Sequence, residues 1–446
     1  MRIQTVKEGT LKAVRCLGVL SALAIGASVL GQSATTPAEE LTEVLRQENV
    51  KSSLAWIDAS EDRLVKSLVS LASIVSPSGQ EQERARWLAE RMRAIGLKDV
   101  NIDAKSNVVG RIKGRSGKPV IFVTTLDDLA TIAELQQTGG KRPHREGDRV
   151  NGPATEVQSV NAAALLAVEA LVRSGVIPEH DIVIASVAQE ETGLIGMKAL
   201  FESWKDRAVG WIDVLGDGQE IVYGAGFIHW WKIVANGRGG HTEEGEYPTV
   251  NHGIARAVDR ILSLPLAKKH DYTFINVGII RSGEVYNHKP ASGWFSLDLR
   301  SMEGEVIHEI ESEVASVLSS VEEETGIRFD MQSVASLDGG QVPGAPESRL
   351  VQLSIAVSRH LGYDPIVSPR GCCNMSIPVS HGRLAIGLHG VRGGKRATAE
   401  EWASIPAMIR TAKYVALLAA AFKENSPLAG IEASGRLILK LFSTKF

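Results

Sequence analysis

The order of strand-like and helix-like runs constrains the fold of this chain more than any single motif. From about residue 45 to 225, short apolar runs typical of buried strands alternate with longer runs whose apolar residues recur at helical spacing. Such alternation predicts a mostly parallel sheet covered by helices. From Gly226 to about residue 337 the order becomes strand, helix, two strands, helix and strand. This βαββαβ order is the ferredoxin-like arrangement.

The first pattern returns from 338 to 423. We therefore predict an α/β fold in which a ferredoxin-like domain (226–337) is inserted into a larger domain (45–225 and 338–423), followed by a basic, apolar tail (424–446). A chain of 446 residues is too long for one compact core, which agrees with two domains. Its net charge of -3 argues against nucleic acid or an anionic membrane surface as the main partner.

Residues 1–35 have the composition of a secretory signal peptide. Four basic residues up to Arg15 precede an apolar run from Cys16 to Leu30, and small residues follow. The run is short and rich in small residues for a membrane span, although an uncleaved anchor is the alternative. We expect an exported protein, periplasmic or extracellular, without a membrane span after cleavage.

After removal of Cys16, only Cys372 and Cys373 remain, and adjacent cysteines do not make a disulfide framework. The sequence leaves two interpretations open, a vicinal disulfide or two small buried residues.

Glu190 and Glu191 form the strongest local signal for chemistry. They follow a buried-strand pattern at 181–186 and precede a helical pattern from 194 to 203. In open α/β sheets the ligand crevice lies at the carboxyl ends of the strands. One acid can then move protons while the other holds a cation. The alternative is a solvated helix N-terminus, where acids are favoured anyway.

An α/β domain with a ferredoxin-like insert and acids at its strand ends resembles metallopeptidase family twenty, which includes aminoacylases, desuccinylases, glutamate carboxypeptidases and tripeptidases. The resemblance covers most of 60–422 and implies a zinc-peptidase-like domain with an inserted lid and dimerisation domain. Family members hydrolyse amide bonds with two zinc ions bridged by an aspartate and a water. Their usual ligands are a His in a His-x-Asp motif, the bridging Asp, the second Glu of a Glu-Glu pair, a further Asp or Glu, and a distant His.

This resemblance implies roles for four acids of the chain. Asp127 matches the Asp of the His-x-Asp motif, and Glu190 matches the general base. Glu191 and Asp217 match two metal ligands, if a metal is bound.

The other three ligand positions depart from the family pattern. Thr125 stands at the first His, Val157 at the bridging Asp and Ala397 at the last His, although a small shift of the alignment finds Asp128 or Glu156 nearby. Catalytic zinc usually has three protein ligands, and here each ion would keep one. The expected cofactor is therefore none or a single divalent metal, zinc being possible, rather than the standard di-zinc centre.

Three further residues match substrate contacts of the family. His241, in a Gly-Gly-His-Thr run, resembles the histidine that reaches a partner subunit and steadies the oxyanion, which implies a homodimer through the inserted domain. Asn287 and Arg300 resemble the residues that hold the substrate's carbonyl and carboxylate. For Arg300 a strand-end ion pair with the following acidic helix is the alternative. The implied partner is a small peptide or an N-acyl amino acid.

Three functions follow from this pattern. The first is a homologue with a degenerate metal site that binds substrate, with metal-independent or no hydrolysis. The second is an active peptidase or N-acyl-amino-acid amidase with a non-standard single metal. The third is a non-catalytic dimeric scaffold. Acids held close without a cation repel one another, so at least one should bind a proton or an ion. Glu190 is the predicted proton carrier.

Overall fold

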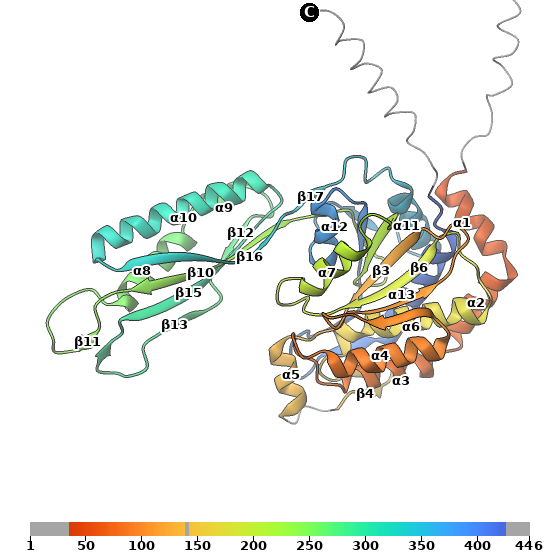
Figure 1. The fold of residues 1–446 in the computed structure, drawn as a ribbon, viewed down its shortest axis with the longest axis horizontal. Coiled ribbons are helices and arrows are strands. Elements are labelled where there is room, and N and C mark those ends of the chain that lie inside the picture. The colour runs from red at the N-terminus through yellow and green to blue at the C-terminus, as the bar shows by residue number, and fades with distance from the viewer. Residues whose placement is uncertain (1–34, 139–141, 425–446) are drawn as a thin grey trace, which may run out of the picture.

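A computed structural model describes residues 35–138 and 142–424 (Figure 1). Apart from one residue each, the predicted signal peptide and the C-terminal tail lie outside these ranges. The larger domain is built on an eight-stranded sheet. In spatial order its strands are Lys98–Ile102 (β1), Val108–Ile112 (β2), Asp181–Val187 (β6), Pro119–Thr125 (β3), Gly210–Val214 (β7), Ala385–His389 (β19), Glu220–Val222 (β8) and Ile366–Ser368 (β18).

The centre of this sheet is parallel. β3 pairs in parallel with β6 and with β7, and β7 pairs in parallel with β19. Every residue of β3, β6 and β7 is buried, as expected for strands covered on both faces. Alternate residues of β3 belong to two separate apolar clusters, one on each face of the sheet. The predicted mostly parallel α/β sheet is confirmed.

Helices cover both faces. They are Pro37–Arg46 (α1), Glu48–Asp58 (α2), Glu61–Ala72 (α3), Gln82–Ile95 (α4), Ala130–Gln137 (α5), Thr155–Arg173 (α6), Ile195–Trp204 (α7), Arg349–His360 (α11), Ser376–Ser380 (α12) and Ile405–Ala421 (α13), with a 3-10 turn at Cys373–Met375 (η1). α6 is long and apolar enough to cross a membrane, but it is buried along most of its length as a core helix. α4 ends at Gly96, whose φ of 97° lies in the left-handed region that glycine adopts freely.

The stretch 136–151 differs from the loop that its polar sequence predicts. Its last residues form two short strands, His144–Glu146 (β4) and Arg149–Asn151 (β5). β5 also pairs with Trp402–Ser404 (β21), which pairs with Gly393–Gly394 (β20). The sequence predicts a helix over 399–422, but β21 occupies part of this range and α13 starts only at Ile405. This small sheet places the 390–401 loop beside the N-terminus of α6.

The inserted domain consists of an antiparallel sheet with helices on one face (Figure 1). Its elements are Phe227–Asn236 (β10), Gly240–His241 (β11), Val250–Leu262 (α8), Leu266–Lys269 (α9), Phe274–Asn276 (β12), Ile280–Ser282 (β13), His288–Lys289 (β14), Ser292–Ser301 (β15), Gly304–Thr325 (α10) and Arg328–Leu337 (β16). The strand order β12-β15-β10-β16 is that of a ferredoxin-like sheet, with the second strand of the motif split into β12 and β13, both paired with β15.

The two domains meet where Gly224–Ala225 (β9) pairs with Gly340–Gln341 (β17). Gly371 of the larger domain joins this junction, because its amide donates to the Gly224 carbonyl (3.0 Å) and its carbonyl accepts from the Gly226 amide (2.9 Å). The residues after Gly371 consequently lie at the base of the inserted domain.

Candidate functional site

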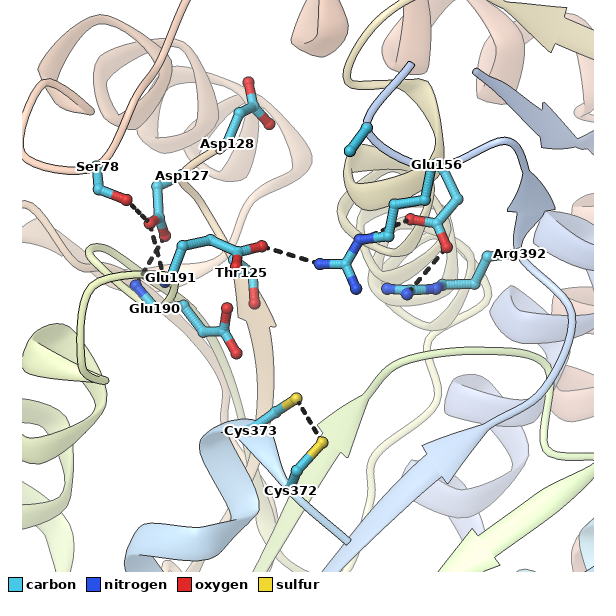
Figure 2. Close-up of polar contacts among 12 residues, drawn as sticks. Ser78, Thr125, Asp127, Asp128, Glu156, Glu190, Glu191, Cys372, Cys373 and Arg392 are labelled. Carbon is cyan, nitrogen blue, oxygen red and sulfur yellow. Dashed lines mark hydrogen bonds and ion pairs between the residues drawn. The ribbon is translucent and has the colours of Figure 1, made fainter. Parts of the chain in front are cut away.

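Asp127 lies just beyond the carboxyl end of β3 and fixes the two acids that follow β6. Its fully buried carboxylate accepts hydrogen bonds from the backbone amides of Glu190 (2.9 Å) and Glu191 (3.2 Å). It also accepts one from the Ser78 hydroxyl (2.5 Å) (Figure 2). Three donors satisfy a carboxylate that has no contact with water. The structure thus brings together three of the acids singled out from the sequence.

The turn that carries Glu190 and Glu191 has a strained backbone. Gln189 (φ 54°) and Leu194 (φ 58°) both lie in the left-handed region, which costs a non-glycine residue roughly 1 kcal/mol. Asn107 clamps the turn, since its side chain accepts from the Ala188 amide (3.0 Å) and donates to the Gly196 carbonyl (2.9 Å). Strain held in place by surrounding bonds is common at functional sites.

Two arginines from the 390–401 loop supply the positive charge of the site (Figure 2). Arg396 contacts Glu191 (2.9 Å), and its Nε lies 3.8 Å from Glu156 at the start of α6. Arg392 binds the other oxygen of Glu156 (2.9 Å). Glu156 and Arg392 are each less than a fifth exposed, so their ion pair is weakly screened by solvent, whereas the Arg396 side chain is about half exposed (48%).

The protonation of Glu190 and Glu191 differs from that of exposed acids. Burial, reinforced by the charge of Glu191, raises the pKa of Glu190 from 4.5 to about 8. Burial also raises the pKa of Glu191, and Arg396 opposes this rise. At neutral pH Glu190 is therefore largely protonated and can donate a proton or a hydrogen bond.

Asp213 is a further acid beside this group. Asp213 is buried near the end of β7 and accepts from the Asn374 side chain (3.3 Å) and the Met375 amide (3.2 Å). Burial raises its pKa to about 7, and its charge contributes to the raised pKa of Glu190.

Asp217, which the resemblance implies as a metal ligand if a metal is bound, makes other contacts in this structure. Its carboxylate pairs with Arg410 (3.0 Å) and accepts from the Tyr363 hydroxyl (3.2 Å) and the Val391 amide (3.0 Å).

Val157, Thr125 and Ala397, the positions at which the resemblance implies lost metal ligands, have the following contacts. Val157 is buried in the first turn of α6, and the acid that reaches the group is its neighbour Glu156. Thr125, at the end of β3, accepts a hydrogen bond from Asn374 (3.4 Å). Ala397 follows Arg396, and its amide donates to the buried Glu401 (3.2 Å).

Glu401 joins the loop to α6. Its other oxygen accepts from the backbone amide of Glu156 (2.8 Å), and burial raises its pKa to about 7. A carboxyl group at a helix N-terminus satisfies a free amide and interacts favourably with the helix dipole.

His241 and Asn287 lie together, far from these acids. The Asn287 side-chain nitrogen is 3.2 Å from Nε2 of His241, and both side chains are exposed. They belong to the β11 region at the tip of the inserted domain, opposite the end that joins the larger domain (Figure 1). Within one chain they therefore do not reach Glu190.

Arg300 lies at the other end of the inserted domain, in the junction. It pairs with Asp298 of its own strand (3.1 Å), not with the following helix. Arg300 lines a cavity of about 180 Å³ together with Arg370, Cys372 and aromatic residues of the inserted domain. Two guanidinium groups beside aromatic rings are suited to a ligand with a carboxylate and an apolar group.

Sequence reasoning missed Arg396, Arg392 and Asp213 as members of the site. A signal for Arg396 was present in the sequence, since this cation directly precedes Ala397, the position to which the resemblance assigns the family's last His. Asp213 lies in residues 210–215, whose sequence predicts a buried strand. Acids are rarely buried unless they are paired, so its position there was a recognisable signal.

In residues 35–138 and 142–424, no group of three or more His, Cys, Asp or Glu side chains has the arrangement of a metal site. Asp127, Glu190, Glu191 and Asp213 interact with one another, and Glu156 joins them through Arg396. The chemistry available to this group is proton transfer by Glu190 and binding of a polar ligand by acids and guanidinium groups.

Comparison with known proteins identifies relatives. The sequence model described as peptidase family M20/M25/M40 matches residues 135–421, more than half of the chain. Carboxypeptidase G2 of Pseudomonas sp. (strain RS-16) is 24% identical over 251 residues, 53% of this chain and 59% of that protein. The match thus spans less than two thirds of that relative.

Solved structures share the fold. The di-peptidase Dug1p from Saccharomyces cerevisiae has a TM-score of 0.69 at 12% identity, covering 85% of this chain and 99% of its own. A tripeptidase from Staphylococcus aureus has a TM-score of 0.66 at 21% identity, covering 81% and 98%. At these identities the likeness concerns the fold alone.

Proposed function

This chain belongs to peptidase family M20/M25/M40, and from this membership we propose that it is an exported peptidase or amidohydrolase homologue that binds a peptide or N-acyl amino acid without a di-zinc centre. Any hydrolysis it performs is independent of metal. The observation that carries this proposal is the guanidinium of Arg396 between Glu191 and Glu156.

Electrostatics and ligand chemistry support the proposal. Arginine stays charged throughout the accessible pH range, so zinc ions bound by Glu191 and Glu156 would face a fixed like charge. The family's two histidine positions hold Thr125 and Ala397, whose side chains are not zinc ligands of the usual kind. On this proposal the residues of the site do not fit a two-zinc centre. Arg392 and Arg396, rather than zinc ions, neutralise the acids.

Ligand binding belongs to the cavity at the junction. Arg300 and Arg370 would hold the carboxylate of the peptide or N-acyl amino acid, and the aromatic lining would receive an apolar group. Glu190, protonated near neutral pH, would donate to the ligand's carbonyl oxygen. The relatives' names, a carboxypeptidase, a di-peptidase and a tripeptidase, agree with a peptide as the ligand.

Metal analysis of protein purified without chelator tests the metal-free site. We expect almost no zinc per chain. Two zinc ions per chain would overturn the proposal, and one zinc together with peptidase activity would favour the single-metal enzyme.

Calorimetric titration with N-acyl amino acids and small peptides tests the ligand class. Arg300→Ala should weaken binding roughly tenfold or more, since it removes a charge-assisted hydrogen bond. Arg281→Ala is the matched control, because Arg281 is an exposed arginine on a neighbouring strand of the same domain. Equal affinities of the two variants would remove Arg300 from the binding site.

Export is part of the proposal and has its own test. In a bacterial host that expresses the full chain, we expect a mature protein in the periplasm or medium whose N-terminus lies near residue 35. A full-length protein in the membrane fraction would instead indicate an uncleaved anchor.

A further inference from the structure

Cys372 and Cys373 lie at the junction between the domains with their sulfur atoms 3.0 Å apart. Both side chains are partly exposed, which is at variance with a pair of small buried residues. Two features hold the pair in place. Gly371 is hydrogen-bonded to the chain that enters the inserted domain, and Cys373 adopts a left-handed backbone (φ 68°) at the start of η1. A non-glycine residue in this conformation is costly and points to a constrained segment.

The surroundings of the two thiols differ. Cys372 lines the cavity that Arg300 and Arg370 also line, whereas Cys373 is not among its lining residues. Figure 2 shows Cys373 on the side of Glu190. A reagent that enters the cavity therefore meets Cys372 first, and Cys373 is within contact distance of the sulfur that has reacted.

Electrostatics add to this asymmetry. The hydrogen bond from Cys373 lowers the pKa of Cys372, and the charges of Arg300 and Arg396 lower it further. The same contact, together with burial, raises the pKa of Cys373 well above its ordinary value. A thiolate beside cations is the reactive form in exchange reactions.

We propose that Cys372 and Cys373 form a thiol–disulfide exchange site for a small disulfide that carries carboxylates, with Cys372 as the attacking thiol and Cys373 as the resolving thiol. The thiol chemistry follows from the sulfur pair, and the preference for carboxylates follows from Arg300 and Arg370 in the same cavity.

The exchange proceeds in two balanced steps. The Cys372 thiolate attacks one sulfur of the small disulfide, which forms a mixed disulfide and releases the first small thiolate. Cys373 then attacks the Cys372 sulfur and forms the Cys372–Cys373 disulfide while the second small thiolate leaves. The two released thiolates take up the two protons that the cysteines lose. The pair is oxidised by two electrons, and the small disulfide is reduced to two thiols.

The product is expected to be readily reduced. Consecutive Cα atoms are about 3.8 Å apart, whereas disulfides usually join Cα atoms about 4.4–6.8 Å apart. A disulfide between neighbours is therefore strained, and small thiols should reverse the reaction.

The test uses the full chain with Cys16→Ser, so that all thiol chemistry comes from the pair. Oxidised glutathione, which carries carboxylates, is compared with cystamine, a disulfide that carries amines. With oxidised glutathione we expect two thiols released per chain and a protein that has lost two hydrogens by mass spectrometry. With Cys373→Ser the reaction should stop at a glutathionyl adduct on Cys372, and with Cys372→Ser no adduct should form.

Recognition of carboxylates is measured by rate. Oxidised glutathione should react roughly tenfold faster than cystamine, and Arg300→Ala or Arg370→Ala should reduce that ratio while Arg281→Ala should leave it unchanged. Equal reaction rates of oxidised glutathione and cystamine with the chain that retains both Cys372 and Cys373 would overturn the proposal. A first adduct on Cys373 would also overturn it. These readouts require neither a bound peptide nor amide hydrolysis, so they can fail or succeed independently of the proposed function.

Discussion

Arg396 gives the acid group a positive charge that belongs to the chain itself. A bound metal can dissociate or exchange, whereas a guanidinium is attached to the loop and remains charged. Its contact with Glu191 opposes the effect of burial on that acid, while Glu190, one residue away, keeps a strongly raised pKa. Burial therefore raises the pKa of both glutamates, and Arg396 counteracts the rise at Glu191.

If Arg396 and the missing imidazoles together prevent zinc binding, restoring the imidazoles alone should not be sufficient. We expect the double variant Thr125→His, Ala397→His to bind zinc weakly or not at all, and the same variant with Arg396→Ala to bind it. Ala397 has φ 62°, a conformation in which histidine is less rare than most residues. Isothermal titration calorimetry with zinc measures the zinc affinity of both variants. Equally tight binding in the presence of Arg396 would show that the arginine does not exclude the metal.

The protonated Glu190 predicts how stability depends on pH. An acid whose pKa is higher in the folded than in the unfolded chain releases its proton on unfolding, so stability falls as pH rises from about 4.5 to about 8. Glu190→Gln should leave stability near pH 4.5 unchanged and raise the free energy of unfolding at pH 8 by roughly 2 kcal/mol. This figure is smaller than the pKa shift of Glu190 alone would give, because the neighbouring carboxyl groups titrate together with Glu190.

Denaturant unfolding at several pH values measures this difference. Glu43→Gln, at an exposed position of α1, is the control and should follow the unsubstituted protein throughout. An identical pH dependence of the Glu190→Gln variant and the unsubstituted protein would contradict the assignment of a proton to Glu190.

At the scale of elements, the turn between β6 and α7 depends on β3 for its shape. Asp127→Asn keeps the size of the side chain but replaces one acceptor oxygen with a donor, so at least one of the amides of Glu190 and Glu191 loses its partner. We expect the free energy of unfolding to fall by about 1–3 kcal/mol and these amides to exchange hydrogen faster. Amides within β3 and β6 should exchange as before.

Hydrogen-exchange mass spectrometry resolves the turn from the strands. Asp330→Asn, on an exposed part of β16, serves as the control for replacing an acid by its amide. If the turn amides of the Asp127→Asn variant exchanged hydrogen no faster than those of the unsubstituted protein, Asp127 would not stabilise the turn.

The elements that the sequence predicted well are those with a long, self-contained pattern. The buried-strand pattern at 181–186 corresponds to β6, and the residues 305–324, whose apolar spacing predicts a helix, correspond to α10, each within about a residue. β5 and β21 are three residues each and pair across about 250 positions, so neither carries a local signal. The same limit applies to the site. Asp127, Glu190 and Glu191 are marked by strand ends, whereas Arg396 joins them only through that small sheet.

At the scale of the whole molecule, the tip and the base of the inserted domain hold different parts of the predicted site. Arg300 lies at the base beside the larger domain, while His241 and Asn287 lie at the tip (Figure 1). A single chain cannot use all three on one ligand in this arrangement. If His241 acts at a site, that site belongs to a second copy of the chain.

We therefore predict a homodimer in which His241 of each chain completes the partner's cleft. Sedimentation should give twice the chain mass, and a strict monomer would remove His241 from the site.

The sharper test pairs two variants in one dimer, His241→Ala on one chain and Arg300→Ala on the other, isolated with two affinity tags. One cleft of this mixed dimer then has its own Arg300 and an intact His241 from the partner, whereas the other lacks both. Ligand titration should recover full affinity at half of the sites, although each variant alone is impaired at all of them. If His241 acted within its own chain, every site of the mixed dimer would lack one group and no high-affinity binding would return.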